Sequence, residues 1–554
     1  MELSDLHGEL SLENLQNVES GEDASEANLM EKQYLEELKL YWSGDTDDSK
    51  HDKNVLDKLQ PHTNLKRIYI HRYGGTTFPK WLGDGSFCNI IFLLLSDCKF
   101  CACLPTLGQL SSLKNLEIEG LDGIVSVGAE LYGMDGTSCT RMAFPSLESL
   151  RFSKMSNWEE WCSSIAIEDG EVFPKLQELI ISDCDRLISI DLSHNLPSLT
   201  KLRIDGDEVV VSSLPRTPTL RQLMLGGRCE KLELQKLPQT METIAIGNRY
   251  SRAGPNCLEI LNCEKVEFPL THHSLRRSSI QEVYVVNSCG SLESFPLDFF
   301  PCLRHLSIEA CKNLVSLTVT KSDEQDVTTT LSLSTLSIQE CPCFVCFPNG
   351  RLHAPNLTEL KVIGCKKLKK LPDQMHNLLP SLKCLFIDDC PEVESFPEGG
   401  LPSNLALLWI RKCSKLIAQR KKWELQKLQA LVDFHILIDS DDDGDSGGEG
   451  VECFPEEGLL PSTLTSLHIY GCASLNRLDI KGLQQLTSLQ RLCVSQHPQL
   501  SQSLPQLHAS FPPSRIGERS PALEEAFCNH ISHIPHSDID FCREFKPKSP
   551  LGRK

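Results

Sequence analysis

Apolar residues recur through almost the whole chain in one pattern, which in one-letter code is L-x-x-L-x-I-x-x-C-x-x-L-x-x-(L/F)-P. A full copy runs from Leu357 to Pro372, and the next begins at Leu382. Most copies follow one another after 21 to 30 residues, a period that is typical of leucine-rich repeats. The first positions of about 18 copies are Leu35, Leu65, Ile90, Leu113, Leu147, Leu176, Leu199, Leu220, Met241, Ile280, Leu303, Leu333, Leu357, Leu382, Leu405, Leu431, Leu464 and Leu489. Partial copies surround residues 258–263 and 10–15.

Within each copy, the second Leu and the Ile are two residues apart, so they lie on the same face of a short strand. The later apolar positions return to the core from the opposite wall. One copy cannot enclose a core, whereas stacked copies bury a continuous one. The pattern therefore predicts an α/β fold. We expect a leucine-rich-repeat solenoid (a horseshoe) with a parallel concave β-sheet and a convex side that is mostly irregular or short-helical.

A cysteine stands at the same position in nine of the full and partial copies, just after the predicted strand. Cysteine is a small residue that is often buried and has a weak S–H donor. We therefore expect these thiols to form a buried ladder along the solenoid. The nine ladder cysteines are Cys98, Cys184, Cys263, Cys311, Cys341, Cys365, Cys390, Cys413 and Cys472.

The pattern divides the chain into three parts. Residues 1–34 form the start of the repeat region, with an amphipathic helix expected over 21–34. Its predicted inward positions are Ala24, Ala27, Met30 and Tyr34. Residues 35–505 form the solenoid, interrupted by an acidic insert loop at 439–450. Residues 506–554, where the pattern fades, form an irregular tail.

The strand positions that alternate with the inward Leu and Ile are expected to face outward on the concave sheet. Unlike the inward ladder, they differ from one copy to the next. Phe386 and Trp409 come from adjacent copies with Asp388 and Arg411 beside them, a composition typical of protein-interface hot spots. The alternative is that these are ordinary surface aromatics without a ligand. The position between the second Leu and the Ile holds Tyr69, Tyr284, Phe386, Trp409, His435 and His468. The position after the Ile holds His71, Glu309, Asp388, Arg411 and Tyr470. The candidate protein-binding set is Tyr69, Tyr284, Phe386, Asp388, Trp409, Arg411, His468 and Tyr470.

Composition narrows the possible partners. The 554 residues carry a formal net charge of −20, which argues against binding to nucleic acid or to an anionic membrane surface. The longest uninterrupted apolar run spans only Ile90 to Leu95, far short of the roughly 20 residues that cross a bilayer. No basic segment followed by an apolar stretch opens the chain. We therefore expect a cytoplasmic protein, with the nucleus as an alternative location, whose 25 cysteines are reduced.

Catalytic and cofactor motifs are missing from the sequence. It has no G-x-x-x-x-G-K-[ST] phosphate loop, no G-x-S-x-G elbow and no H-E-x-x-H pair. The stretch from Gly83 to Cys88 lacks the third glycine of a dinucleotide fingerprint. The stretch from Asp439 to Gly444 resembles the start of a calcium loop, but position twelve is Gly450 instead of Glu. We therefore expect no enzyme activity and no cofactor.

Metal ligands are not predicted either. Two groups of three cysteines, 98–103 and 341–346, are close together, but no second Cys or His pair follows at the offset that zinc sites use. His530, His533 and His536 are interpreted as surface histidines. The basic residues between Lys366 and Lys422 are interpreted as a solvated face. The alternative for this cluster is an electrostatic dock for an acidic partner domain.

Several segments resemble one protein family. Residues 6–18 (LHGELSLENLQNV), 24–29 and 35–42 are similar to the opening of the leucine-rich-repeat region of plant coiled-coil nucleotide-binding (CNL-type) disease resistance proteins. The later segments 78–82, 104–110, 144–147, 158–161 (WEEW) and 482–489 also resemble this region, as does 531–535. The resemblance covers residues 3–505, and the segment beyond Pro505 departs from the family ending.

The resemblance implies an intracellular immune-receptor module. Such a module recognises a pathogen effector or a guarded host protein, and it regulates defence signalling through protein–protein binding. A nucleotide-binding domain, in cis or in trans, is a second implied partner. The nucleotide-binding and coiled-coil domains of the family are absent from this chain. The sequence leaves open whether it is part of a longer receptor or a repeat-only protein. A constitutive scaffold and a substrate-selecting ubiquitin-ligase subunit are the alternatives.

Overall fold

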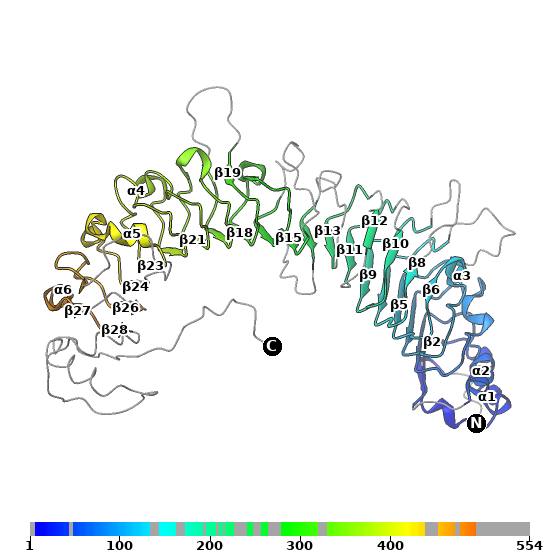
Figure 1. The fold of residues 1–554 in the computed structure, drawn as a ribbon. Helices are drawn as coiled ribbons and strands as arrows, with labels where there is room; N and C mark the ends of the chain where they lie inside the picture. The colour runs from blue at the N-terminus through cyan, green and yellow to red at the C-terminus, as the bar shows by residue number, and fades with distance from the viewer. Residues whose placement is uncertain are drawn as a thin grey trace, which may run out of the picture. The chain divides into compact units, whose positions relative to one another are not determined.

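The computed structural model describes residues 6–43, 48–132, 143–161, 172–191, 196–205, 210–213, 217–226, 241–247, 256–263, 279–319, 330–437, 453–470 and 477–494. The chain forms two compact units that divide near residue 280. Unit 1 holds the N-terminal repeats, and unit 2 holds the C-terminal repeats. Each unit is a coil in which every repeat contributes one strand to a parallel sheet (Figure 1).

In unit 1, eleven described strands pair in parallel, each with the next along the chain. They are β1 (Gly8–Leu12), β2 (Leu35–Tyr41), β3 (Arg67–His71), β4 (Phe92–Ser96), β5 (Asn115–Glu119), β7 (Ser149–Ser153), β9 (Glu178–Ser182), β11 (Lys201–Ile204), β13 (Gln222–Leu225), β14 (Thr243–Ile246) and β15 (Cys257–Leu261). The partial copies around Leu10 and Leu258 are thus complete strands of the sheet.

In unit 2, nine described strands also pair in parallel, each with the next along the chain. They are β16 (Glu282–Val286), β18 (His305–Glu309), β20 (Thr335–Gln339), β21 (Glu359–Ile363), β22 (Cys384–Asp388), β23 (Leu407–Arg411), β24 (Asp433–Leu437), β26 (Ser466–Tyr470) and β28 (Arg491–Val494).

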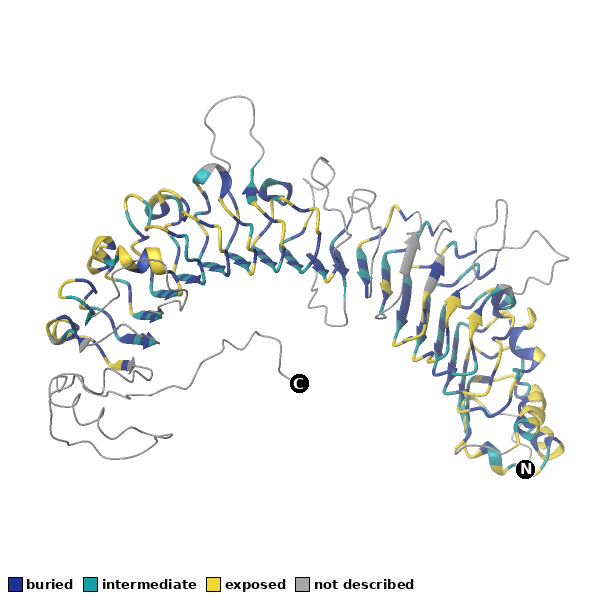
Figure 2. Ribbon diagram, viewed as in Figure 1, coloured by how far each residue is buried: buried dark blue, intermediate teal, exposed yellow. Residues whose placement is uncertain are grey.

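The register of these strands places equal template positions side by side. Leu360 pairs with Leu385 of the next strand, and Val362 pairs with Ile387. Buried and half-buried residues therefore alternate along strands such as β18, β21 and β23 (Figure 2). The first positions of all eighteen copies are buried as well. Each large aliphatic side chain buried in this way contributes about 1.5–3 kcal/mol. The predicted leucine-rich-repeat solenoid with its parallel sheet is confirmed.

The opposite wall consists of short elements. Small parallel ladders join β6 (Ser126–Val127), β8 (Glu160–Trp161), β10 (Ser189–Asp191) and β12 (Val210–Ser213), then β17 (Ser294–Pro296) and β19 (Ser316–Thr318), and β25 (Cys453–Phe454) and β27 (Arg477–Leu478). The described α-helices are α1 (Gly21–Glu26), α2 (Ser49–Lys58), α3 (Ala129–Tyr132), α4 (Met375–Leu378), α5 (Ser414–Ala418) and α6 (Ile480–Gln484). Single 3₁₀ turns cover Leu15–Asn17, Leu29–Glu31, Lys80–Gly83, Leu107–Gln109, Leu297–Phe299, Pro348–Gly350, Arg420–Lys422 and Leu425–Lys427.

A left-handed residue precedes every described ladder cysteine. Asp389, for example, has φ 51° and lies between β22 and Cys390. Left-handed backbone costs a non-glycine residue about 1–2 kcal/mol. A hydrogen bond offsets this cost. The N–H of Asp389 donates to the carbonyl of Arg411 at 2.9 Å, which extends the pairing between β22 and β23 by one residue. The turn then points the cysteine side chain into the core.

The eight described ladder cysteines are buried, as predicted, and Cys472 lies outside the described residues. In most of them, the Sγ donates to a carbonyl of the preceding repeat. The Cys390 Sγ lies 3.6 Å from the carbonyl oxygen of Val362, and the Cys413 Sγ lies 3.7 Å from that of Ile387. The thiols thus satisfy backbone carbonyls inside the coil. Burial raises the pKa of the Cys98, Cys184 and Cys341 thiols to about 12.

The N-terminal helix is shorter than the sequence predicted. Helix α1 ends at Glu26, because Asn28 adopts a left-handed conformation with φ 45° and starts a separate turn. Ala24 is buried, as expected, but Met30 and Tyr34 are 57% and 46% exposed, and Leu29 takes the inward position. The acidic insert at 439–450 and the tail at 506–554 lie outside the described residues.

Replacing Leu360 with Ala should lower the free energy of unfolding by about 2–5 kcal/mol, because it leaves a cavity in a fully buried row. Chemical denaturation followed by circular dichroism measures the change. The control is Lys370→Ala, at an exposed position of the same repeat. Equal midpoints for the two variants would contradict the inward assignment of Leu360.

Thiol labelling tests the buried ladder. At pH 8, Cys98, Cys184 and Cys341 should react more than ~100-fold more slowly than the exposed Cys88, Cys103, Cys302 and Cys346, because the thiolate is the reactive form. A raised pKa also means that these thiols stabilise the fold below pH 9, and that this contribution is lost as the pH rises toward 12. Mass spectrometry after timed alkylation gives the rate for each site. Uniform rates in the native protein would contradict the ladder.

Candidate functional site

One row of outward side chains crosses five neighbouring strands of unit 2. Lys361, Phe386, Trp409, His435 and His468 come from β21, β22, β23, β24 and β26, and the strand register pairs each with the next. We call these five residues the aromatic row. Four copies of the repeat thus place a ring at the same outward position, each at the centre of its strand.

The side chains of the aromatic row contact one another. The Lys361 Nζ lies 5.0 Å from the Phe386 ring centroid, a cation–π distance. The Phe386 and Trp409 centroids are 6.3 Å apart and tilted by 37°. Trp409 stacks on His435 at 4.4 Å, and His435 stacks on His468 at 4.0 Å with an interplanar angle of 2°. The row is therefore a packed strip and not a set of separate surface rings.

This packing changes the exposure of the predicted contact residues. We expected Phe386 and Trp409 to be exposed, but both are half-buried because each ring covers part of its neighbours. Aromatic pairs of this kind contribute about 0.5–1.5 kcal/mol beyond area burial. The strip consequently presents ring edges and faces held in defined positions. Such a surface loses little conformational entropy when it binds a partner.

A second row lies two residues further along the strands and contains Asp388, Arg411 and Tyr470. Arg411 donates to Asp388 through two bonds, with Nε–Oδ1 at 2.7 Å and Nη2–Oδ2 at 2.6 Å. This hydrogen-bonded pairing raises the pKa of Arg411. Asp388 lies on the outward face, as strand alternation predicts, but its side chain is only 6% exposed. The paired Arg411 covers it and is the charged group that remains accessible.

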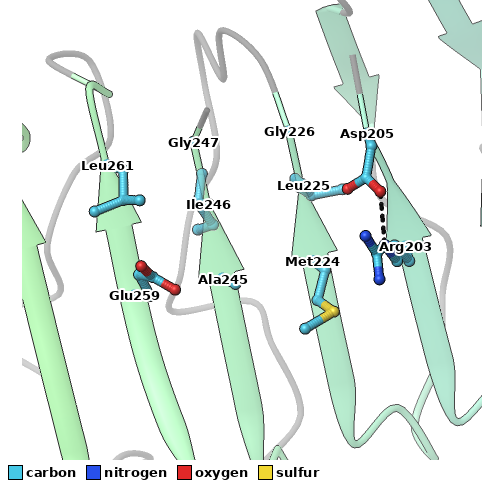
Figure 3. Close-up of a pocket in the computed structure, with 10 residues that line it drawn as sticks. All are labelled: Arg203, Asp205, Met224, Leu225, Gly226, Ala245, Ile246, Gly247, Glu259 and Leu261. Atoms are coloured by element: carbon cyan, nitrogen blue, oxygen red, sulfur yellow. Dashed lines mark hydrogen bonds and ion pairs between the residues drawn. The ribbon is translucent and has the colours of Figure 1, made fainter. Parts of the chain in front are cut away.

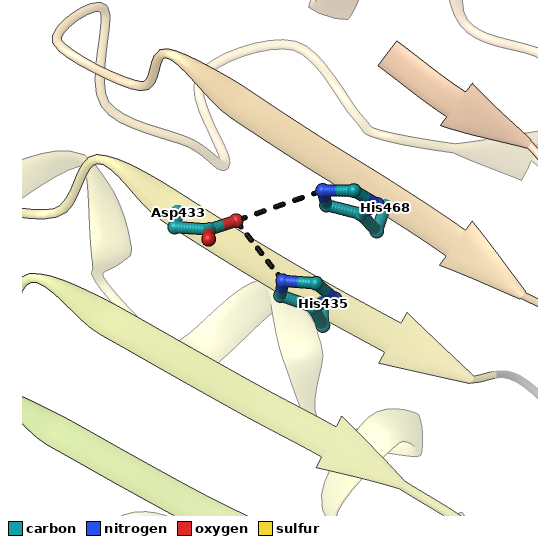
Figure 4. Close-up of side chains that lie close together, drawn as sticks. All are labelled: Asp433, His435 and His468. Atoms are coloured by element: carbon teal, nitrogen blue, oxygen red, sulfur yellow. Dashed lines mark ion pairs between the residues drawn. The ribbon is translucent and has the colours of Figure 1, made fainter. Parts of the chain in front are cut away.

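Around the two histidines, polar groups from both strands converge (Figure 4 shows three of the residues). The Asp433 Oδ1 lies 3.1 Å from the Nε2 of His435 and 3.8 Å from that of His468. The Ser466 hydroxyl lies 2.8 Å from the His468 Nε2. The Tyr470 hydroxyl lies 3.4 Å from the Nδ1 of both rings. One end of the aromatic row is thus a compact polar cluster.

The cluster contains charged and neutral groups at pH 7. Burial lowers the pKa of His468 to about 4, and the nearby His435 and Arg491 lower it further, against the opposing effect of Asp433. For Asp433, burial acts to raise the pKa. The neighbouring His435, His468 and Ser466 outweigh burial and lower it. His468 is therefore neutral and Asp433 ionised at neutral pH.

Tyr69 and Tyr284 do not join this cluster. Tyr69 lies on β3 in unit 1, where its ring is 5.0 Å from that of Phe92 and 5.4 Å from the Lys39 Nζ. Tyr284 lies on β16 of unit 2, and the outward positions of β18 and β20 between it and Lys361 are serines. Its hydroxyl donates to Glu282 at 3.2 Å. The predicted set thus separates into the unit 2 cluster and two single tyrosines.

Sequence reasoning missed Asp433, Ser466 and Lys361. Asp433 and Ser466 stand two residues before His435 and His468 on the same strands, so they share the outward face. Lys361 stands at the same template position as Phe386. The signal was therefore present in the strand alternation. The prediction used only the central outward position and the one after it, and it left out the position before the second Leu.

Several of the basic residues after the strands of unit 2 are paired with acidic residues of neighbouring repeats. Lys366 forms an ion pair with Asp389. Lys415 pairs with Glu392 at 2.8 Å, and Arg420 pairs with Glu456 at 2.7 Å. Because these cations already have acidic partners, the pairing supports the interpretation of a solvated face.

A small hollow in unit 1 is a second concave feature of the sheet. It lies at the carboxyl ends of β11, β13, β14 and β15, and small residues such as Ala245 and Gly247 line it (Figure 3). Gly247 has φ +126°, and a Cβ at this position would lie 1.8 Å from the Leu261 carbonyl oxygen. The volume is about 70 Å³, well below the roughly 300–1,000 Å³ of small-molecule sites. A wider hollow of about 400 Å³ lies in unit 1 beside Tyr41, His71 and Arg72. We place the candidate protein-binding site at the aromatic row because its rings pack into one strip.

The leucine-rich-repeat family described as R13L1/DRL21 LRRs matches residues 1–121. An Arabidopsis thaliana disease resistance protein is 27% identical, with alignment to 97% of this chain and 51% of its own length. The disease resistance RPP13-like protein 1 of the same plant is 29% identical over 67% of this chain and 30% of its own length. Disease resistance protein RGA2 of Solanum bulbocastanum is 33% identical over 37% of this chain and 21% of its own length.

Similar solved structures are leucine-rich-repeat proteins of low identity. They include TLR13 in complex with ssRNA13, at 15% identity, with 89% of this chain and 58% of that chain covered and a TM-score of 0.36. The circular leucine-rich-repeat protein CroV588 is also 15% identical, with 88% and 79% covered and a TM-score of 0.31.

Together, the family match and the curated relatives confirm that this chain resembles the leucine-rich-repeat region of plant disease resistance proteins. It spans about half, or less, of the length of these three relatives. Among the residues that the structure describes, no helix has the length and apolarity needed to cross a bilayer.

Replacing Arg411 with Ala should lower the free energy of unfolding by about 1–3 kcal/mol, because the nearly buried Asp388 carboxylate loses its charged donor. Asp388→Asn should cost less, since the amide keeps the shape and one acceptor oxygen. Denaturant titration compares the variants. Lys415→Ala, which opens an exposed pair with Glu392, is the control and should change little. A loss no larger than the control's would contradict the structural role of this pair.

Proposed function

We propose that this chain is a non-enzymatic recognition module that binds a protein through the aromatic row of unit 2 and acts in plant defence. The feature that carries the proposal is the strip of packed rings, which the accessible Arg411 flanks. Protein interfaces concentrate their binding energy in such clusters of aromatic and arginine side chains. The resemblance to plant disease resistance proteins supports the defence role.

The ligand in this proposal is a pathogen effector or a guarded host protein, met in the cytoplasm. Its binding would regulate signalling by a nucleotide-binding domain, in cis or in trans. The outward positions support a protein ligand because they differ from strand to strand: Lys361, two large aromatic rings and two imidazoles occupy equivalent places. A surface of this kind distinguishes partners by shape and charge.

A constitutive scaffold is the alternative function, and the same surface would serve it. A scaffold holds its partners in healthy tissue, whereas a sensor gains or loses a partner upon infection. Comparing captured proteins from uninfected and infected leaf extracts separates the two. Equal partner sets in both extracts would favour the scaffold.

The double substitution Phe386→Ala and Trp409→Ala should weaken partner capture more than tenfold while leaving the fold intact, because both rings are outward. Quantitative mass spectrometry of proteins captured from leaf extract by the wild-type and variant chains measures the loss. Circular dichroism and melting verify the fold.

The matched control is Ser307→Ala, at the equivalent outward position of β18. It should retain the partners that the double variant loses. The proposed surface would be wrong if the double variant, correctly folded, captured the same partners as wild type in the same amounts.

A further inference from the structure

Three potential metal donors meet at the end of the aromatic row. Asp433 and His435 are two residues apart on β24 and so share its outward face, and His468 is the register partner of His435 on β26. One donor atom from each of the three residues lies within 4.8 Å of the others. The two strands hold these side chains together without any loop, which is the rigid support that a metal site needs.

The donor spacing suits a small divalent ion. In tetrahedral zinc sites, nitrogen and oxygen ligands lie about 2.0–2.2 Å from the metal, which puts neighbouring donors about 3.3 Å apart. The distances of 3.1 and 3.8 Å from Asp433 Oδ1 to the two Nε2 atoms lie on either side of this value. The imidazole rings are parallel and 4.0 Å apart, so a modest tilt brings both nitrogens to one ion.

The surrounding hydroxyls favour the protonation state that metal binding requires. The Tyr470 oxygen lies near the Nδ1 of both rings, where it can accept their N–H groups. The Ser466 hydroxyl can donate to the Nε2 of His468. In the tautomer in which Tyr470 accepts both Nδ1–H groups, the Nε2 of each ring carries no proton and faces Asp433. Outer partners of this kind orient histidine ligands in known metal sites.

A cation would stabilise one oxygen of the Asp433 carboxylate. The Asp433 Oδ1 is buried, and its 3.1 Å approach to the His435 Nε2 lacks good hydrogen-bond geometry. With Nε2 unprotonated, two nitrogen lone pairs and a carboxylate oxygen face one another, an arrangement that is repulsive without a positive charge between them. A buried polar atom without a partner is uncommon and calls for an explanation such as an ion.

We propose that Asp433, His435 and His468 form a site for a divalent transition-metal ion of the zinc class. Two imidazoles and one carboxylate are an established zinc ligand set, and three protein ligands leave a further position for water or for a side chain of a partner. The site goes beyond the proposed function and does not depend on it. It belongs to the same outward face, however, so a bound ion would form part of the surface that a partner meets.

Zinc titration against a chromogenic chelator tests the site, using the full chain without a histidine tag. Wild type should bind one more equivalent of Zn²⁺ than His435→Gln or His468→Asn, and Asp433→Asn should weaken that equivalent more than tenfold. His305→Gln, on β18 of the same unit, controls for binding at other histidines. Circular dichroism verifies that every variant folds. Equal stoichiometry and affinity for wild type and all three ligand variants would overturn the proposal.

Trp409 provides a second, local readout because its ring stacks 4.4 Å from that of His435. Cu²⁺ bound at the site should quench its fluorescence. The quench should be absent in Trp409→Phe and in His435→Gln, and it should persist in His305→Gln. A quench that survives in both Trp409→Phe and His435→Gln would place the ion elsewhere and overturn the assignment. Partner capture by the Phe386 and Trp409 double variant is measured separately, in buffer that contains a chelator and therefore no free metal. The protein-binding proposal and the metal-site proposal can thus fail independently of each other.

Discussion

Parallel pairing of each strand with the strand one repeat later, residue against residue, is the constraint on which the rest of the structure depends. Because the register does not drift, a residue type that recurs in the template becomes a continuous row in space. On the inward side, Leu360 and Val362 meet Leu385 and Ile387, and the rows close the core that no single repeat could enclose. The left-handed residue before each described ladder cysteine, such as Asp389, depends on the same register. It carries the hydrogen-bond ladder one step further and turns the following cysteine into the core.

The same register gives the outward face its chemistry. Side chains that the sequence separates by a full repeat become neighbours at contact distance, so Trp409 stacks on His435 and Arg411 closes over Asp388. Asp433 approaches both imidazoles for the same reason. These contacts rigidify the strip and bury part of each ring. The proposed recognition surface and the proposed metal site are thus two uses of one row, since both depend on positions repeated across adjacent strands.

Much of the fold could be predicted because its determinants are local and repeated. The spacing of Leu357, Leu360 and Val362 implies a strand with one apolar face, and repetition of that spacing implies stacking. The same kind of periodicity did not predict where the N-terminal helix, expected over 21–34, ends. Met30 and Tyr34 fit a helical period, but a left-handed Asn28 interrupts the helix. Asparagine adopts this conformation more readily than most residues and often follows the end of a helix, so the break has a signal in the residue type that the helical period does not contain.

For the site, the sequence by itself determined which residues face outward: Phe386, Trp409, His435, His468 and Arg411 follow from alternation along each strand. Only the tertiary structure decided what those residues do to one another. Asp388 is outward by alternation, yet Arg411 from the next repeat covers it. Asp433 looked unremarkable until the register set it against two imidazoles. The physical reason is that facing depends on the period of a single strand, whereas contact depends on the alignment of two strands and on the rotamers that their side chains adopt together.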